Sequence, residues 1–260
     1  HVGATPKIVD ISTSDFNLCA ATVKKGITPK TRAIIVPHMF GTPAELDELL
    51  SLGIPIIENC AHSLGAEYKK RKVGSFGTLS ICSFYATKMI ATGEGGAILT
   101  NDHEIYEKII ETREYDKKPL NIVRYNYKMT DIQAALGLSQ LKKLDNFIRR
   151  RREIGEIYNE QFSECSVILP YTQLHKRTVF YRYVVLVDKL EQVQRMAKKR
   201  GIMCEKPVLK PLHQSFPHIE CPNCDYVYDR ALSIPLYPSL TEKETEYVAK
   251  TLEMVFTERK

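Results

Sequence analysis

The sequence has 260 residues, and no apolar stretch in it approaches the roughly 20 residues that a membrane-spanning helix needs. Its first residues are mixed and polar and show no signal-peptide pattern. There is no internal repeat and no low-complexity tract. With 43% hydrophobic and 26% charged residues, the composition is that of a soluble globular protein with one large or two smaller domains.

The cysteines give no sign of a disulfide framework, because there are seven of them and most lie in apolar context. We therefore expect a reducing cytoplasm. Cys221 and Cys224 form one Cys-x-x-Cys pair, and with His213 and His218 they could supply four zinc ligands. A zinc ribbon would need a second pair, so we favour a proline-containing loop with incidental cysteines and predict no metal.

The formal net charge is +6, but no basic stretch has interleaved aromatic residues of the kind that stack on nucleic-acid bases. The densest basic run is RRRR at residues 149–152. On a helix these side chains point around most of the circumference, so a solvated helix surface is the favoured interpretation. Binding of an anionic small molecule such as a nucleotide diphosphate ranks second, and a nucleic-acid groove third.

Strands and helices alternate through the first hundred residues. Apolar runs at 32–37 and 54–58 are typical of strands buried on both faces, and a short strand is expected at 7–10. Between the two longer strands, a helix over 42–52 is expected to begin at a Thr42 cap. The alternation indicates an α/β fold, a mostly parallel sheet with flanking helices.

A long helix is predicted from a cap at Thr130 to Phe162, with a bend near Gly155. Because a helix of this length often joins two domains, we place a large domain at 1–150 and a smaller C-terminal domain at 151–260.

The smaller domain is predicted to be α+β. Its expected strands lie at 181–187 and 203–208, with a helix over 190–200 between them. A final helix is expected to follow a capping box that starts at Thr241.

Lys88 is the most informative residue. The apolar stretch 79–84 brings it to a strand end, and the glycine-rich turn TGEGG follows at 92–96. Ligands of parallel sheets bind beyond the carboxyl ends of the strands, which also points to residues 38–41 and 59–63. A lysine held there suits a Schiff base with an aldehyde cofactor; the alternative is a surface lysine beside a hairpin turn.

Five ordered motifs decide between these alternatives. They are IIVPHMFGTPA (34–44), IIENCAHSLGAEY (56–68), VGSFG with SFYATKMIATGEGG (73–77 and 83–96), NYKMTDIQAA (126–135) and LSIPLYPSLT (232–241). Together they resemble the motifs of the DegT-type sugar aminotransferases over nearly the whole chain. The TGEGG form is most similar to the perosamine-synthetase branch.

The resemblance implies a fold type I aminotransferase that uses pyridoxal 5'-phosphate, with pyridoxamine phosphate as an intermediate. It implies transfer of an amino group, typically from glutamate, to a nucleotide-linked keto-sugar in polysaccharide or amino-sugar biosynthesis. Members with histidine in place of the lysine are dehydratases, so Lys88 favours amino transfer. A homodimer with a shared active site is implied as well.

The same resemblance implies roles for individual residues. Lys88 would form the Schiff base and shuttle the proton, and Ser83 would hydrogen-bond the cofactor phosphate. His62 would lie at the cofactor ring near its phenolic oxygen, and Asn126 would reach the phosphate from a second subunit. His213 could contact the substrate. For the last four, the alternatives are ordinary roles in turns, caps and packing.

Two departures from the family pattern matter. The family normally has Asp where this chain has Asn59, and that carboxylate keeps the cofactor's pyridine nitrogen protonated. Its loss could cost several kcal/mol, or roughly 10²–10³ in rate. Family members also carry roughly eighty further residues before the equivalent of Val2, including a phosphate-binding turn at a helix N-terminus. The rival expectation is therefore a truncated, non-catalytic relative with a regulatory or assembly role.

Overall fold

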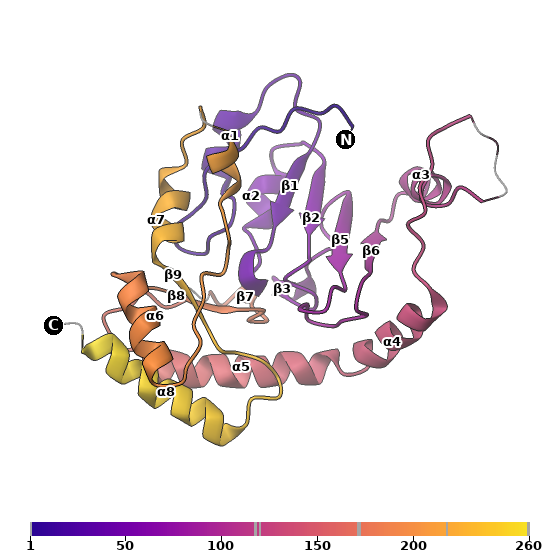
Figure 1. Cartoon of the computed structure of the whole chain (residues 1–260). Helices are drawn as coiled ribbons and strands as arrows, with labels where there is room; N and C mark the ends of the chain where they lie inside the picture. Colours follow the sequence, from indigo (N-terminus) through magenta and orange to yellow (C-terminus); the bar gives the residue numbers. More distant parts are fainter. Residues whose placement is uncertain (1, 117–118, 120, 171–172, 217, 259–260) are drawn as a thin grey trace.

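A four-stranded sheet forms the centre of the N-terminal part of the chain, with strand order β1–β2–β5–β6 (Figure 1). Its strands are β1 (Ile34–Pro37), β2 (Ile56–Asn59), β5 (Leu79–Ser83) and β6 (Gly96–Leu99). The first three are parallel, and β6 is antiparallel to β5. The computed structural model describes residues 2–116, 119, 121–170, 173–216 and 218–258. The predicted α/β class with a mostly parallel sheet is confirmed.

Helices α1 (Ala20–Gly26) and α2 (Leu46–Leu50) cover one face of this sheet. The packed side chains include Val23, Leu46, Leu49, Val36 and Ile56. On the opposite face, Ile35 is 61% exposed. The prediction of burial on both faces is therefore wrong for β1, because the described helices that pack on this sheet do so on one side.

Residues 7–10, predicted as a strand, do not form one. The carboxylate of Asp10 instead accepts hydrogen bonds from the backbone N–H groups of Asn223 and Cys224, at 3.0 and 2.9 Å. Both donors lie in the first turn of α7 (Pro222–Arg230), where unpaired N–H groups attract a carboxylate. A tertiary contact thus takes the place of strand pairing.

The helix predicted over 42–52 is shorter than expected and is not capped by Thr42. It begins at Leu46, after a 3₁₀ turn η1 (Met39–Gly41). The Thr42 hydroxyl lies 3.1 Å from that of Thr178 instead, so a long-range hydrogen bond replaces the cap.

Two helices replace the single long helix that was predicted. They are α4 (Asp131–Leu141) and α5 (Leu144–Gln161), and α3 (His103–Arg113) precedes them. Thr130 and Gln133 form the expected capping box at the start of α4. Figure 1 shows α3 standing away from the rest of the chain. Across the described ranges, no helix is both long and apolar enough to cross a membrane.

The bend expected near Gly155 is absent, since Gly155 lies within α5. A Cβ atom there would lie 2.7 Å from the ring of Phe180. Glycine is therefore required at this position for close packing and does not break the helix.

The C-terminal part is built on a two-stranded antiparallel sheet covered by helices. Its elements are β8 (Tyr183–Leu186), β9 (Ala231–Ile234), α6 (Leu190–Lys199), α8 (Glu242–Thr257) and η2 (Leu212–Ser215). Thr241 and Glu244 form the predicted capping box of α8. The strand expected over 203–208 is reduced to a single bridge between Glu205 and Ser233.

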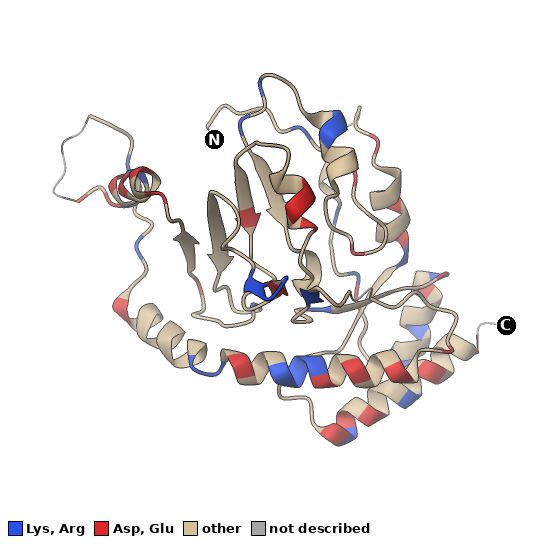
Figure 2. Ribbon diagram, turned by 180° about the vertical axis from the view of Figure 1, so that it is seen from behind, with Lys and Arg blue, Asp and Glu red and all other residues tan. Residues whose placement is uncertain are grey.

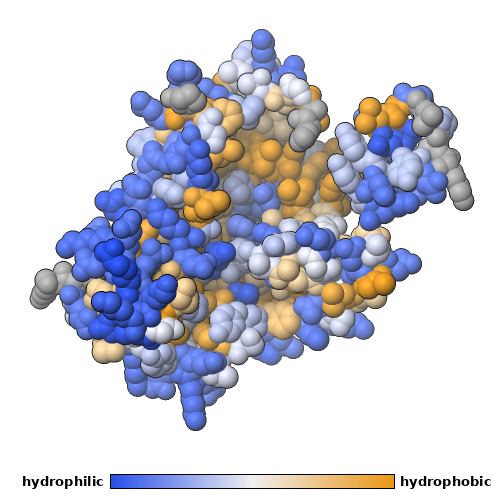
Figure 3. Space-filling view, in the orientation of Figure 1, coloured by the Kyte–Doolittle hydropathy of each residue, from blue (hydrophilic) through white to orange (hydrophobic). Residues whose placement is uncertain are grey.

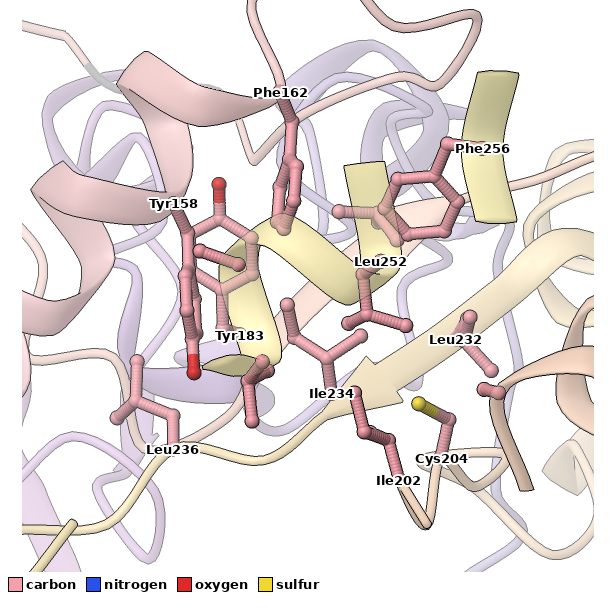
Figure 4. Packing of buried hydrophobic residues seen from close by; sticks show 14 of the residues in the cluster. Tyr158, Phe162, Tyr183, Ile202, Cys204, Leu232, Ile234, Leu236, Leu252 and Phe256 are labelled. Atoms are coloured by element: carbon pink, nitrogen blue, oxygen red, sulfur yellow. The ribbon is translucent and has the colours of Figure 1, made fainter. Parts of the chain in front are cut away.

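Helix α5 contributes to two separate hydrophobic clusters. Leu144 and Ile148 pack under the parallel sheet. Further along, Tyr158 and Phe162 join the C-terminal cluster, where they lie near Phe256 and other α8 side chains (Figure 4). The change occurs near residue 150, where we place the proposed domain boundary.

A small sheet beside the main one contains a hairpin, which the sequence predicts from the segments 66–68 and 72–74 joined by residues 69–71. It comprises β3 (Glu67–Tyr68), β4 (Arg71–Lys72) and β7 (Lys176–Arg177), all antiparallel. The hairpin is confirmed, whereas its pairing with β7, distant in sequence, was not foreseen.

Candidate active site

The parallel strands end together at one edge of the sheet. Pro37 pairs with Asn59, and Asn59 pairs with Ile81, so β1, β2 and β5 reach this edge in register. Asn59 is the last residue of β2, and Ser83 is the last of β5. This is the edge at which ligands of parallel sheets bind.

Lys88 is half-buried in the segment that follows β5. Its neighbours Met89 and Ile90 are each 4% exposed and anchor the segment in the core. In the glycine-rich turn, Gly95 has a φ of +143°, and a Cβ atom there would lie 2.8 Å from Thr92 Oγ1. Only glycine fits this position, so the turn fixes the path of the chain beyond the lysine.

Three rings form a stack beside Lys88. The His62 ring lies 4.3 Å from that of Tyr181 at 17°, and 6.3 Å from that of Phe40 at 10°. Lys88 Nζ lies 5.2 Å from the centroid of the Tyr181 ring, a cation–π distance. The Tyr181 hydroxyl lies 3.4 Å from Thr87 Oγ1. Tyr181 therefore links His62 to the lysine segment.

His62 is held in its neutral form by its surroundings. Burial lowers the pKa of His62 first, and the positive charges of Lys88 and Arg182 lower it further, to about 4. At neutral pH the imidazole can accept or donate a hydrogen bond but carries no charge. The positive charges at this edge are those of Lys88 and Arg182.

Asn59 offers a neutral amide where a carboxylate was expected from the resemblance. Its Oδ1 accepts a hydrogen bond from the backbone N–H of Ala61 at 3.1 Å. The neighbouring carboxylate, Glu58, is fully buried on the opposite face of β2 and lies 3.1 Å from His38 Nε2. Burial alone would raise the pKa of Glu58, but hydrogen bonds from His38 and from backbone amides lower it.

His38, Glu58 and Cys60 are the one group of three potential metal ligands found within the described residues. His38 Nδ1 accepts from the N–H of Ala44 at 3.1 Å, so Nε2 carries the proton and donates to Glu58. Glu58 also accepts from three backbone N–H groups of the 74–77 turn. The polar atoms of His38 and Glu58 are thus occupied by hydrogen bonds within the fold, and we assign these residues a structural role.

The remaining predicted site residues have other partners. Ser83 Oγ lies 3.4 Å from the backbone N of Tyr85, in its own turn. Asn126 is exposed between α3 and α4, where its backbone pairs with that of Glu114. His213 is 5% exposed, and its Nε2 lies 3.0 Å from Asp225 of α7. The substrate role of His213 and the phosphate roles of Ser83 and Asn126 stay predictions.

The alternative zinc site is also built differently from a metal centre. Cys221 is buried, and Cys224 lies in the first turn of α7 with its N–H bound to Asp10. No third ligand joins these two cysteines within the described residues.

Sequence reasoning missed Tyr181 and Arg182. They were assigned to the start of a strand, and their contacts with His62 and Ser233 join distant parts of the sequence. An aromatic–arginine pair just before a buried strand is the one local signal that could have drawn attention to them.

A pocket of about 590 Å³ lies next to the lysine segment. Thr87 and Tyr181 line it on the side of Lys88. Its other walls include Arg151, Arg182, Ser233 and Tyr237. The size is that of a site for a small molecule.

The sequence profile of the DegT/DnrJ/EryC1/StrS aminotransferase family matches residues 1–253. The chain is 30% identical to the GDP-perosamine synthase of Escherichia coli O157:H7 over 282 residues, with 100% of this chain and 75% of that protein covered. It is 33% identical to the GDP-perosamine synthase of Caulobacter vibrioides over 276 residues, with 98% and 74% covered.

Among solved structures, it is similar to PseC of Helicobacter pylori, an aminotransferase involved in pseudoaminic acid biosynthesis. The TM-score is 0.90 at 26% identity, over 98% of this chain and 74% of that one. The chain thus spans about three quarters of the length of each of these relatives.

Proposed function

Because the chain belongs to the DegT/DnrJ/EryC1/StrS aminotransferase family, we propose that it transfers an amino group from glutamate to a nucleotide-linked keto-sugar. The observation that carries this proposal is the placement of Lys88 at the carboxyl edge of the sheet, beside neutral His62 and a pocket. The names of the two GDP-perosamine synthases support a nucleotide sugar as the substrate, and we propose that its product serves polysaccharide or amino-sugar biosynthesis. Free thiols at all seven cysteines support a cytoplasmic location.

The residues at this edge fit pyridoxal 5'-phosphate. Lys88 would hold it covalently, Ser83 would hydrogen-bond its phosphate, and His62 and Asn59 would lie at its ring. Lys88 forms no ion pair in the part of the chain that the structure describes, so its amine is available. When bound, the cofactor supplies an electron sink for the substrate carbanion.

Lys88 Nζ would also carry the proton that leaves the substrate carbon, since it is the basic group at this edge that suits the task. His62 is not the proton donor at neutral pH, because its pKa is about 4. It would instead keep the ring in place through the stack with Tyr181 and Phe40.

Absorption spectroscopy tests the proposal. With added pyridoxal 5'-phosphate, the purified chain should absorb at about 410–430 nm, as expected of a lysine-bound cofactor. Lys88→Ala should abolish the band, and the exposed control Lys243→Ala should keep it. Glutamate should then bleach it. Absence of any Lys88-dependent band would refute the proposed function.

A non-catalytic relative is the second candidate, and Asn59 favours it. The amide cannot hold a proton on the cofactor's ring nitrogen by charge pairing, so turnover would be slow even with the cofactor bound. Asn59→Asp separates the two functions: a large gain in transamination supports an enzyme, and no turnover in a cofactor-loaded Asp variant supports the non-catalytic role.

We propose that a second copy of the chain covers the α3–α4 arm. Neither helix has a buried residue, and Ile132, Leu138 and Tyr127 are 84%, 64% and 71% exposed. Figure 3 shows apolar side chains along α4 and over the central sheet. Asn126, on this arm, would then reach the partner's cofactor phosphate.

Mixing two inactive variants tests the shared site. In a mixed dimer of Lys88→Ala and Asn126→Ala, one site has both defects and the other has none. Re-formed mixtures should therefore recover up to about a quarter of the wild-type activity. If the mixture stays as inactive as its components while both remain dimeric, Asn126 does not act across the dimer.

A further inference from the structure

The pocket beside Lys88 is lined by two arginines, Arg151 and Arg182, that form no ion pair within the described residues. Arg182 is half-buried on its wall, and Nη1 lies 3.3 Å from Ser233 Oγ. Within the described ranges, neither Arg182 nor Lys88 forms an ion pair. The Arg182 guanidinium carbon lies 5.8 Å from the centroid of the Tyr181 ring, which places it close to the ring stack.

Arg151 adds a buried cation to the same wall. It is 7% exposed, and its Nη1 donates to the carbonyl oxygens of Phe180, Tyr181 and Leu236 at 3.1–3.2 Å. Its Nε has no hydrogen-bond partner among the residues that the structure describes. The prediction that residues 149–152 form a solvated helix surface is therefore wrong for Arg151. Figure 2 shows the acidic and basic residues along α5.

Two carboxylates also line the pocket, but neither forms an ion pair with these cations within the described residues. They are Glu205 and Glu244, and both are exposed. Glu244 accepts hydrogen bonds from the Thr241 hydroxyl and backbone N–H, in the cap of α8. The guanidinium groups of Arg151 and Arg182 therefore have carbonyl and hydroxyl partners, and neither has a carboxylate partner among the described residues. Such a surface favours an anionic ligand.

We propose that Arg182 binds an anionic oxygen group of the substrate in this pocket, with Arg151 supporting it from beneath. The group is a carboxylate of the amino donor or a phosphate of the nucleotide sugar. Both offer oxygen atoms that a planar guanidinium binds with two parallel hydrogen bonds. The inference rests on the proposed function for these ligands, and on Arg182, Arg151 and the pocket for the site.

Calorimetric titration of the full chain tests the site without turnover. The probes are glutarate, a dicarboxylate without an amine, and GDP, each titrated with pyridoxal 5'-phosphate present. Arg182→Gln should raise the Kd of at least one probe roughly tenfold to a hundredfold, the effect of losing a charge-assisted contact. Arg182→Lys keeps the positive charge but not the paired N–H donors of the guanidinium, so it should raise the Kd by a smaller factor. The control is Arg195→Gln, an exposed arginine of α6 that should leave both Kd values unchanged.

The two ligand sources give different results. Weaker binding of glutarate alone assigns the site to the donor carboxylate, and weaker binding of GDP alone assigns it to the nucleotide phosphate. Wild-type chain that binds neither probe overturns the proposal, as does Arg182→Gln with both Kd values unchanged and an unchanged unfolding midpoint. The 410–430 nm band reports separately on the proposed function. If probe binding depends on Arg182 but the band is absent, the anion site is supported and the aminotransferase function is refuted. If the band is present but probe binding does not depend on Arg182, the aminotransferase function is supported and the anion site is refuted.

Discussion

Replacing Lys88 with alanine should raise the pKa of His62. The structure lowers that pKa from 6.5 to about 4, by burial first and then by the charges of Lys88 and Arg182. Lys88 Nζ and the His62 ring both lie on Tyr181, at 5.2 and 4.3 Å from its centroid. Since the pKa falls from 6.5 to about 4 and burial is the largest cause, the charge of Lys88 costs the imidazolium at most about 1.7 kcal/mol. Lys88→Ala removes this repulsion, but burial remains, so the pKa should stay below 6.5.

The same pKa predicts how the folding free energy depends on pH. The unfolded chain binds a proton at His62 near pH 6.5, whereas the folded chain binds it only near pH 4. Between these values the unfolded state holds more protons, so the free energy of unfolding falls as the pH falls. The loss reaches about 2 kcal/mol by pH 4.5. His62→Gln cannot bind the proton and should lack this component.

Two measurements check the prediction. NMR titration of the histidine ring protons, assigned with His62→Gln, should give the pKa of His62 in the wild type and in Lys88→Ala. Urea unfolding at pH 7.5 and 4.5 should show a smaller loss of stability for His62→Gln than for the wild type. Comparing the two proteins removes the contribution of carboxylates such as Glu58, whose stabilisation is also lost in acid. A His62 pKa near 6.5 in the wild type, or an unchanged pKa in Lys88→Ala, would refute the electrostatic reasoning.

Three further predictions concern single substitutions. Asn59→Asp keeps an oxygen for the N–H of Ala61 and should raise the transamination rate by roughly 10²–10³, measured in single turnovers with glutamate; a gain below threefold would contradict the charge argument. Glu58→Gln places an amide N–H₂ against backbone donors and should cost about 3 kcal/mol in urea unfolding, and a loss below about 1 kcal/mol would show that this network is not needed. Leu138→Glu, on the exposed face of α4, should shift a dimer toward monomer in light scattering, and an unchanged mass would remove α4 from the interface.

Much of the frame could be predicted because its signals are local. Apolar runs mark β1 and β2, and side chains that bond to backbone three residues away mark the starts of α4 and α8. The edge position of Lys88 follows from strand order and the glycine-rich turn. These patterns depend on interactions between residues close in sequence, so the elements they predict are the ones found in the structure.

The contacts that shape the site could not be predicted, since each joins distant parts of the chain. The stack of His62 on Tyr181 depends on how β8 meets the parallel sheet. Which of the arginines at 149–152 is buried depends on the close approach of Phe180 to Gly155. Helical periodicity alone does not fix either contact, because it says nothing about the neighbouring element.

Strand geometry explains why Asn59 matters more than its neighbour. Successive residues of β2 point to opposite faces of the sheet, so Glu58 is directed into the core and Asn59 to the other face. A slip of one residue would bring the carboxylate to the site, but it would also expose Ile56 and break the bonds that Glu58 makes with the 74–77 turn. The carboxylate is therefore one residue away and unusable. This chain therefore has the residues that would hold the cofactor, such as Lys88 and Ser83, but lacks a carboxylate to keep the ring nitrogen protonated. We expect a Lys88-dependent absorption band together with slow turnover.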